Sequence, residues 1–415
     1  MPLDLDVVRG RFPALSGDVV FFDNGGGSQI VQPVLDRIRS FLVESNVQLG
    51  ASYAVSQLAS ARLAEAHEGV ATLMNAPHPD DVVMGPSTTS LLRTLGESLA
   101  RTIEPGDEVI VTNGDHEANI GPWLALERAG ARVRFWNVDP TSGELDVDDL
   151  RPLLGARTRL VAVTHTSNIL GSINPIRAIA DAVHEHGAWL CVDGVGFAPH
   201  RAVDVQSLDV DFYAFSFYKT FGPHHAVLYG RGELLRALPG LGFFFIEESD
   251  VPYKFQPGNV NYELSYGVLG ILDYLDEIAA SLGHVSHGQP ARPARDRGAV
   301  EAAFGAFAAH EATLGGRLLD VLGSKPRVRV VGSSSADPAA RVPIISFVVD
   351  GMASSSVVEA VDPHGIGIRY GHFYSARLVE ALGHTEGDGV VRVSMVHYNT
   401  VEEVDRLVQV FDQLF

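Results

Sequence analysis

The chain has 415 residues, of which 46% are hydrophobic and 42 are glycine, a composition typical of a globular enzyme with room for two packed domains. Its formal net charge of −20 argues against nucleic-acid and anionic-membrane partners, because both would be repelled. No apolar run is long enough to predict a spanning helix, and the acidic N-terminus does not resemble a signal peptide. We therefore expect a cytoplasmic protein that binds neither nucleic acid nor membranes.

Two residue types are scarce enough to restrict the chemistry. The single cysteine, Cys191, excludes an internal disulfide and a thiolate metal cluster. The only lysines are Lys219, Lys254 and Lys325, and the last two lie in predicted loops with nothing convergent nearby. Any reaction that requires a lysine must use one of these three.

Short apolar runs alternate with amphipathic segments through the first part of the chain. Helical spacing of apolar positions predicts helices over 122–129 and 175–185. Apolar strands that alternate with helices indicate a largely parallel sheet covered on both faces, with ligands beyond the carboxyl ends of its strands. The predicted strands cover residues 19–22, 107–112, 132–138, 159–165, 188–194, 211–217 and 225–231.

The pattern changes after Tyr262. A stretch rich in Pro, Arg and Gly, 284–298, is expected to be a surface loop. The sequence therefore predicts a large α/β domain over 17–262 and a smaller α+β domain made of 1–16 and 263–415. The smaller domain is expected to contain helices over 263–282, 299–322, 354–361 and from 401, and strands over 328–332, 341–349, 365–371 and 390–398.

Polar side chains at predicted strand ends and helix starts are candidates for ligand binding. Ser87, Thr88 and Thr89 begin an amphipathic helix whose free N–H groups favour a phosphate, although an ordinary helix cap is the simpler interpretation from local sequence. His116 offers a ring that can stack on a cofactor, whereas its pairing with one glutamate makes a poor metal site. Asn168 follows a strand, where an asparagine is often only a turn residue.

Asp193 and Lys219 provide the stronger signals. Asp193 ends a buried strand, where a carboxylate is costly unless it is paired; the protonated pyridine nitrogen of pyridoxal 5'-phosphate would suit it, and capping of the next loop is the alternative. Lys219 lies in an apolar turn, where desolvation lowers the pKa toward the neutral amine that Schiff-base chemistry needs. A lysine that extends from the turn to solvent is the alternative for Lys219.

Seven ordered motifs resemble the class V aminotransferase family, and within it the cysteine-desulfurase-like branch. They are FFDNGGGSQ, GDHEANIGPW, THTSNILGSINP, VDGVGFAPH, SFYKTFGPH, RYGHFYSARL and RVSMVHYNTVEEVDRL, and the resemblance extends from about residue 12 to the C-terminus. It implies a homodimeric pyridoxal-phosphate enzyme of fold type I, with a large cofactor-binding domain and a small C-terminal domain. From the poor ligand set around His116 and the single cysteine, we predict no metal.

The resemblance also implies a role for each matched residue. Lys219 would hold the cofactor as a Schiff base and move the substrate Cα proton, Asp193 would bind the pyridine nitrogen, and Arg392 would bind the substrate carboxylate. Asn259 would reach across the dimer to the partner's phosphate. The positions expected to bind the cofactor are Thr88, Thr89, His116, Asn168, Asp193, Ser216, Tyr218, Lys219 and Asn259.

Departures from the family pattern affect the expected reaction. Tyr374 occupies the position of the mobile sulfur-carrying cysteine, Gly196 replaces a glutamine, and Tyr218 replaces a histidine. With Cys191 expected to be buried, we predict lyase or transferase chemistry on a small amino acid through an external aldimine, without a persulfide. Tyr374 and His372 are candidates for substrate selection. Transamination, elimination with C–S lysis, epimerisation or racemisation, and a non-catalytic scaffold or sensor remain open.

Overall fold

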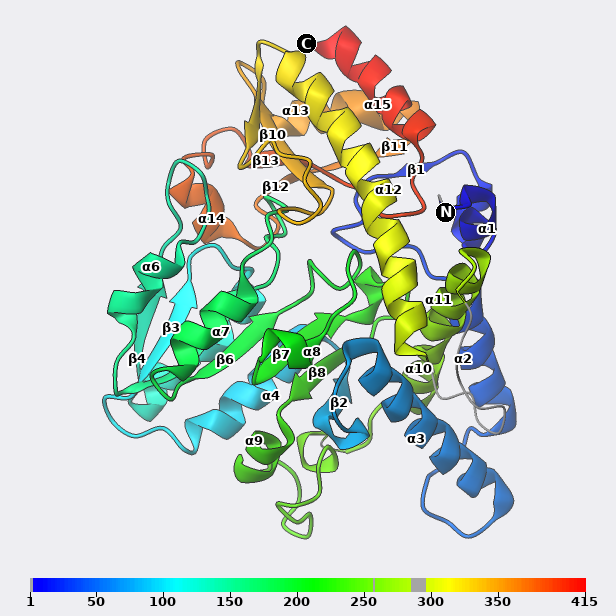
Figure 1. Cartoon of the computed structure of the whole chain (residues 1–415), viewed down its shortest axis with the longest axis vertical. Coiled ribbons are helices and arrows are strands. Elements are labelled where there is room, and N and C mark those ends of the chain that lie inside the picture. The colour runs from blue at the N-terminus through cyan, green and yellow to red at the C-terminus, as the bar shows by residue number, and fades with distance from the viewer. Residues whose placement is uncertain (1–2, 257, 285–295) are drawn as a thin grey trace.

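The computed structural model describes residues 3–256, 258–284 and 296–415. Most of the predicted surface loop 284–298 therefore lies outside the described residues. A large sheet flanked by helices occupies the lower part of the molecule in Figure 1, and a smaller sheet with its own helices lies above it. This arrangement is the α/β class predicted from the alternating pattern.

A seven-stranded mixed sheet forms the centre of the larger part, in the order β2-β8-β7-β6-β5-β3-β4. The five strands from β7 to β4 in this order are parallel, whereas β8 is antiparallel to both β7 and β2. The strand β2 was not predicted, because it is a short run closely followed by a helix cap. The strands are β2 (Val82–Gly85), β3 (Glu108–Thr112), β4 (Arg132–Trp136), β5 (Thr158–Thr164), β6 (Trp189–Asp193), β7 (Phe212–Ser216) and β8 (Ala226–Gly230).

Helices cover both faces of this sheet, as the continuous apolar strands predict. Successive residues of β5 point to opposite faces, so Val161 and Val163 pack in one core while Leu160 and Ala162 pack in the other. The first core contains α3 (Ala54–Met74), α7 (Ile176–His184) and α11 (Leu269–Ser281), and the second contains α4 (Thr88–Ala100) and α5 (Gly121–Leu124).

The predicted strand 19–22 does not join the large sheet. It forms the two-residue strand β1 (Val20–Phe21), which pairs in parallel with β11 (Ile366–Gly367), because Val20 and Phe22 are buried in the core of the smaller domain. That domain has a four-stranded antiparallel sheet in the order β12-β13-β10-β9. Its elements are β9 (Val328–Val331), β10 (Ile344–Val349), β12 (Arg369–Gly371), β13 (Val390–Ser394), α13 (Ser354–Val361) and α15 (Val401–Leu414).

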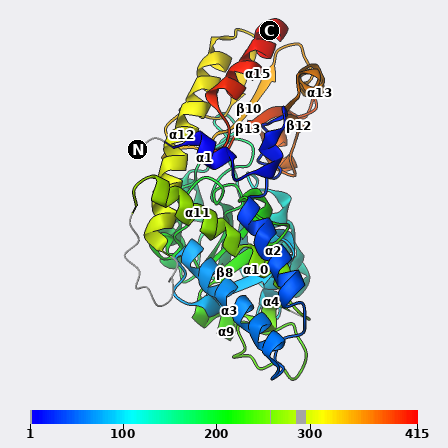
Figure 2. The same cartoon turned by 90° about the vertical axis from the view of Figure 1, so that its right-hand side faces the viewer.

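The segment after residue 262 forms two helices rather than one, α10 (Tyr262–Gly267) and α11. Both pack beside α2 (Gln32–Glu44) on the flank seen in Figure 2, within the core of the large sheet. The helix α12 (Arg297–Ser324) then contributes to both cores, with Phe307 in that of the large sheet and Leu318 in that of the small one. The domain boundary at 262 stays a prediction.

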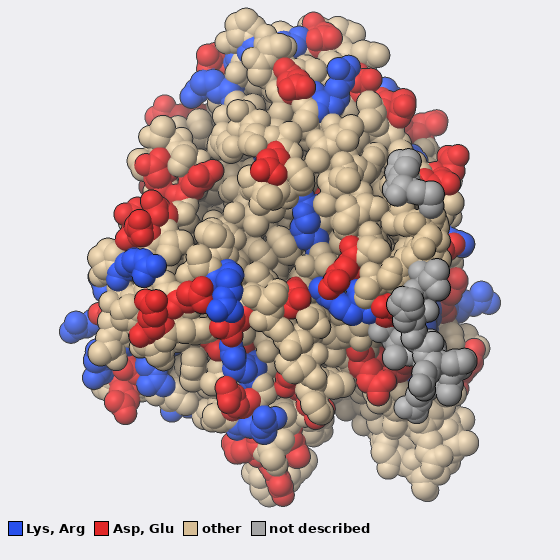
Figure 3. All heavy atoms as spheres, in the orientation of Figure 1, with Lys and Arg blue, Asp and Glu red and all other residues tan. Residues whose placement is uncertain are grey.

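The surface carries both signs of charge. Acidic and basic side chains are intermixed over the face in Figure 3, without a continuous basic stripe. Within the described ranges, no helix is long and apolar enough to cross a membrane. The features that bear on function are therefore the strand ends of the large sheet and the elements that meet them.

Candidate functional site

A pocket lies where the parallel strands of the large sheet end, at the edge where such sheets bind ligands. The carboxyl ends of β5, β6 and β7 provide its floor, and the start of α4 and the loop after β3 complete it. Eight of the nine predicted cofactor-binding residues line it, all but Asn259. Its lining includes Thr88, Thr89, His116, Thr164, Thr166, Asn168, Asp193, Gly196, Ser216, Tyr218 and Lys219.

Lys219 follows β7 in a single helical turn, η6 (Phe217–Lys219). Burial and the positive charge of Arg392 lower the pKa of Lys219 to about 8, while Asp193 and Asp23 oppose the change. Phe221, with a left-handed φ of 63°, closes the turn. Near neutral pH, the fraction of Lys219 that is a neutral, nucleophilic amine is therefore much larger than that of an ordinary lysine.

Asp193 is a buried carboxylate at the last position of β6. Its Oδ1 accepts a hydrogen bond from the N–H of Val195 at 2.9 Å. Burial raises the pKa of Asp193, and the nearby Lys219 opposes that rise. A protonated pyridine nitrogen would supply the charge partner that this carboxylate needs in a poorly solvated site.

His116 is held as a neutral ring. Its Nδ1 accepts a hydrogen bond from the N–H of Ala118 at 3.0 Å, so the ring proton belongs on Nε2. Burial, with the positive charges of Lys219 and Arg392, lowers the pKa of His116 to about 4. An uncharged aromatic ring at the pocket wall suits stacking on a planar cofactor.

The hydroxyl cluster at the start of α4 contains both a helix cap and residues that line the pocket. Ser87 caps the helix by accepting from the N–H of Ser90 at 3.1 Å, which leaves Thr88 and Thr89 to line the pocket. The Oγ1 of Thr88 lies 2.7 Å from Oγ of Ser216. A phosphate placed here would meet hydroxyls and the positive end of the helix dipole.

Gly196 is required by the backbone that faces it. A Cβ at this position would lie 2.7 Å from the carbonyl oxygen of Thr166, too close without a backbone shift. A side chain larger than that of glycine would therefore need a backbone shift at position 196. Thr166 itself has a buried Oγ1 without a hydrogen-bond partner among the described residues, which leaves a polar atom for a bound group. With amine, carboxylate, ring and hydroxyls in place, the pocket fits pyridoxal phosphate.

A second pocket adjoins the first and shares His116, Asn168, Tyr218 and Lys219 with it. Its further lining comes from the smaller domain and the glycine run, with Gly25, Gly26, Arg369, Phe373, Tyr374 and Arg392. Because Lys219 lines both pockets, a substrate in the second would meet the amine that faces the first.

Arg392 is buried in this second pocket with a defined set of contacts. Its guanidinium donates to Oδ1 of Asp23 at 2.8 Å and to the carbonyl oxygen of Asn168 at 3.1 Å, and its Cζ lies 3.9 Å from the ring centroid of Phe373. Its buried Nε has no partner in the described part of the chain. Each terminal nitrogen of Arg392 uses one of its two hydrogens in the bonds to Asp23 and Asn168, so the guanidinium retains donors for a carboxylate.

Asp23 and Arg369 are two further residues at this site that were not predicted from the sequence. Asp23 follows β1 and lies between the two arginines, with its Oδ2 3.6 Å from the Arg369 guanidinium. The available signal was its position in the motif FFDNGGGSQ. The contacts of Asp23 with the two arginines join segments more than 340 residues apart, so no local sequence pattern predicts them.

The loop after β12 carries Tyr374 and His372, both exposed. Phe373 and Tyr374 have left-handed φ values of 50° and 60°, a conformation that costs about 1–3 kcal/mol for each such residue. The carbonyl of Tyr374 accepts a hydrogen bond from the N–H of Glu117 at 2.8 Å. The N–H of Tyr374 donates to Nδ1 of His372 at 3.1 Å. The loop is therefore tied to the large domain.

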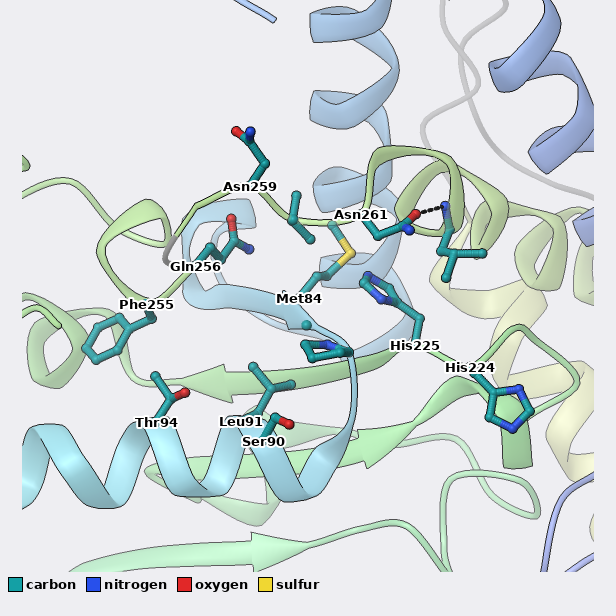
Figure 4. Close-up of a pocket in the computed structure, with 14 residues that line it drawn as sticks. Met84, Ser90, Leu91, Thr94, His224, His225, Phe255, Gln256, Asn259 and Asn261 are labelled. Atoms are coloured by element: carbon teal, nitrogen blue, oxygen red, sulfur yellow. Dashed lines mark hydrogen bonds between the residues drawn. The ribbon is translucent and has the colours of Figure 1, made fainter. Parts of the chain in front are cut away.

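Asn259 lies apart from this site, in the hollow shown in Figure 4. This hollow shares no lining residue with the Lys219 pocket and includes the apolar side chains of Met84, Leu91 and Phe255. The exposed Asn259 accepts from the hydroxyl of Tyr262 at 2.8 Å. Within this chain alone it does not contribute to the cofactor pocket.

The expectation that nothing converges on Lys254 is wrong. Lys254 is buried, and its Nζ donates to the carbonyls of Arg236, Leu238 and Glu248 at 3.0, 2.6 and 2.7 Å. These bonds fix its amine in a structural role, so Lys254 does not compete with Lys219.

The single cysteine, Cys191, is buried in β6, as expected. Burial raises the pKa of its thiol.

Comparison with known proteins agrees with this geometry. The chain is 45% identical to the aminotransferase-like protein FGM3 of Gibberella zeae, covering 97% of this chain and 96% of the relative. It is 34% identical to the cysteine desulfurase-like protein ustD of Aspergillus flavus, over 99% and 91% of the two chains. The crystal structure of the cysteine desulfurase CsdA of Escherichia coli superposes with a TM-score of 0.83 at 28% identity, over 99% and 98% of the chains.

The family model for aminotransferase class-V matches residues 20–289 and 300–407. That span contains both pockets and nearly all of both sheets. The resemblance of the motifs, the fold type I architecture and the expected cofactor are thus confirmed together. The chain belongs to the class V aminotransferase family and is a pyridoxal-phosphate-dependent enzyme of its cysteine-desulfurase-like branch.

Proposed function

We propose that this enzyme acts on a small amino acid by lyase or transferase chemistry that requires no persulfide. The observation that carries the proposal is the position of Lys219, whose amine lines the cofactor pocket beside Asp193 and also the adjoining pocket that contains Arg392. One amine can therefore serve both the cofactor and the substrate.

Asp193, Arg392 and Lys219 would each have a different chemical role. Bound pyridoxal phosphate would supply an electron sink for the electron pair left at the substrate Cα. Asp193 would hold a proton on the pyridine nitrogen, and Arg392 would bind the substrate carboxylate in competition with Asp23. Lys219, with a pKa of about 8, would then accept the Cα proton and return it.

The absence of a suitable thiol supports a route without sulfur transfer. Tyr374 stands at the position of the family's mobile cysteine, and its loop is tied to Glu117. Cys191, the only cysteine, is fixed in β6 with its thiol pKa raised by burial. A thiol that is neither mobile nor ionised is a poor sulfur acceptor.

The test is a screen of amino acids with the cofactor-loaded enzyme that measures keto acid, ammonia, sulfide and racemised product separately. The proposal expects keto acid or an elimination product, lost in Lys219→Ala and retained in Cys191→Ser. Racemisation alone would indicate an epimerase. Sulfide release from cysteine that disappears in Cys191→Ser would restore the persulfide route. A protein that binds the cofactor and turns over nothing would favour a scaffold or sensor.

We further propose a homodimer in which Asn259 completes the partner's phosphate site. Three features of the hollow beside Asn259 support this proposal: its apolar lining, the exposed Asn259 side chain, and two buried polar atoms, Nδ1 of His225 and Nε2 of Gln256, that lack partners among the described residues. Buried polar atoms of this kind usually meet a partner molecule or water.

Subunit complementation tests the shared site. Lys219→Ala and Asn259→Ala subunits are unfolded, mixed and refolded with pyridoxal phosphate. If Asn259 serves the partner, random mixing leaves about one quarter of the sites with both residues intact, and the visible absorption of the lysine-bound cofactor recovers to that extent. No recovery, or a monomer in sedimentation, would contradict the proposal.

A further inference from the structure

Ser375 is a buried residue between β12 and α14 (Ala376–Ala381) that contacts the predicted cofactor ligand Asn168. Its hydroxyl donates to Oδ1 of Asn168 at 2.8 Å. The other end of the same amide, Nδ2, donates to the carbonyl oxygen of Phe373 at 3.0 Å. A backbone carbonyl can only accept, so the amide nitrogen must face Phe373 and the amide oxygen must face Ser375.

The orientation of this amide matters because Asn168 lines both pockets. Nδ2 carries two hydrogens, and one is committed to Phe373. The second remains for a group bound in the pockets. Without the Ser375 hydroxyl, Oδ1 of Asn168 would lose its hydrogen bond, and nothing in that contact would keep the amide oxygen turned away from the pockets.

The same contact restrains the loop that carries Tyr374. The ring of Tyr374 lies with its centroid 5.3 Å from that of His116, and its backbone is left-handed. Bulky residues keep such a conformation only where their surroundings determine it. On one side, Glu117 binds both the Tyr374 carbonyl and, at 2.7 Å, the side chain of Arg377. On the other side, Ser375 is the side chain that ties the loop to Asn168.

We propose that Ser375 is a positioning residue: through Oδ1 of Asn168 it sets the donor geometry of that amide and holds Tyr374 over His116. Only the expected effect on kcat and KM rests on the function proposed above. The hydrogen bond between Ser375 and Asn168 is present in the protein without cofactor. Ser375 does not line either pocket, so it acts through Asn168 rather than on the substrate.

The experiment is a double-mutant cycle of Ser375→Ala, Asn168→Ala and the double variant. Three quantities are measured: hydrogen exchange of residues 371–377 in the apoprotein, the pH titration of the visible cofactor band, and kcat and KM separately. Ser375→Ala is expected to exchange about tenfold faster in the loop, to shift the titration of the band, and to raise KM about tenfold with a smaller change in kcat. In the Asn168→Ala background, Ser375→Ala should add little.

Ser98→Ala is the matched control, because Ser98 is also buried and its hydroxyl donates to the carbonyl of Pro239 at 2.6 Å, outside both pockets. It should leave all three quantities unchanged. If Ser375→Ala fails to fold, Ser375→Cys keeps a similar volume with a weaker donor and is expected to change them in the same direction. Unchanged loop exchange, or additive effects in the cycle, would overturn the proposal. A wild-type protein that captures no cofactor would instead refute the proposed function, and the exchange measurement would still decide the role of Ser375.

Discussion

The depressed pKa of Lys219 predicts how fast the apoprotein captures pyridoxal phosphate at each pH. Only the neutral amine attacks the cofactor aldehyde. With a pKa of about 8, about one tenth of Lys219 is neutral at pH 7 and about nine tenths at pH 9. The capture rate should therefore rise about tenfold between these values and level off above pH 9. An ordinary lysine, with a pKa near 10.5, would still be gaining neutral amine at that pH.

Two substitutions should move this midpoint in opposite directions. The positive charge of Arg392 disfavours the ammonium form of Lys219, so Arg392→Gln is expected to raise the midpoint. The negative charge of Asp193 favours the ammonium form, so Asp193→Asn is expected to lower it. The direction of each shift follows from charge alone.

The assay is stopped-flow absorbance of stripped protein mixed with excess pyridoxal phosphate, at constant ionic strength from pH 6 to pH 10. Lys219→Ala should give no visible band. Lys325→Ala, which removes a lysine paired with Asp412 on the surface, should behave as wild type. A midpoint near 10, or shifts of the same sign in Arg392→Gln and Asp193→Asn, would refute the account of the site's electrostatics.

Two further predictions concern stability and the shape of the pocket. Glu311→Ala should lower the free energy of unfolding by about 3 kcal/mol in urea denaturation, because it leaves Arg201 and His200, both within 3.1 Å of Glu311 in a buried cluster, without their carboxylate. Gly196→Ala should lower the free energy of unfolding by about 1–3 kcal/mol and weaken cofactor binding in a fluorescence titration, because the new Cβ meets the carbonyl of Thr166.

Exposed positions supply controls for both measurements. Glu402 is an exposed acid at the start of α15, and Glu402→Ala should change the free energy of unfolding by no more than about 0.5 kcal/mol. Gly17 has open space around the Cβ position, so Gly17→Ala should leave cofactor binding unchanged. Equal effects at Glu311 and Glu402, or at Gly196 and Gly17, would show that burial and contact are not the cause.

Much of the cofactor pocket was predictable because its residues follow a local rule. Asp193 and Ser216 each end an apolar strand, and Asn168 and Lys219 follow shortly after one. The carboxyl ends of parallel strands meet at one edge of a sheet, so a periodic pattern is enough to bring these side chains together. The scarcity of lysine then left few candidates for the amine.

Local patterns did not extend to contacts between distant segments. The pairing of β1 with β11, rather than with the large sheet, depends on where Val20 and Phe22 find a core, since a two-residue strand carries almost no information about its partner. The burial of Lys254 was missed for a similar reason, because the carbonyls around its amine come from the end of α9 (Gly232–Ala237) and from Glu248.

By itself, the sequence determined the fold class through its alternating pattern and the cofactor through its family motifs, and it left Lys219 as the predicted Schiff-base lysine, because strand ends, motifs and residue scarcity are properties of the chain alone. Only the tertiary structure decided the environment of that lysine. It placed Asp23 against Arg392 and Ser375 against Asn168, across 369 and 207 residues of sequence. Such contacts depend on how two cores pack against each other, and this packing leaves no periodic trace in either segment.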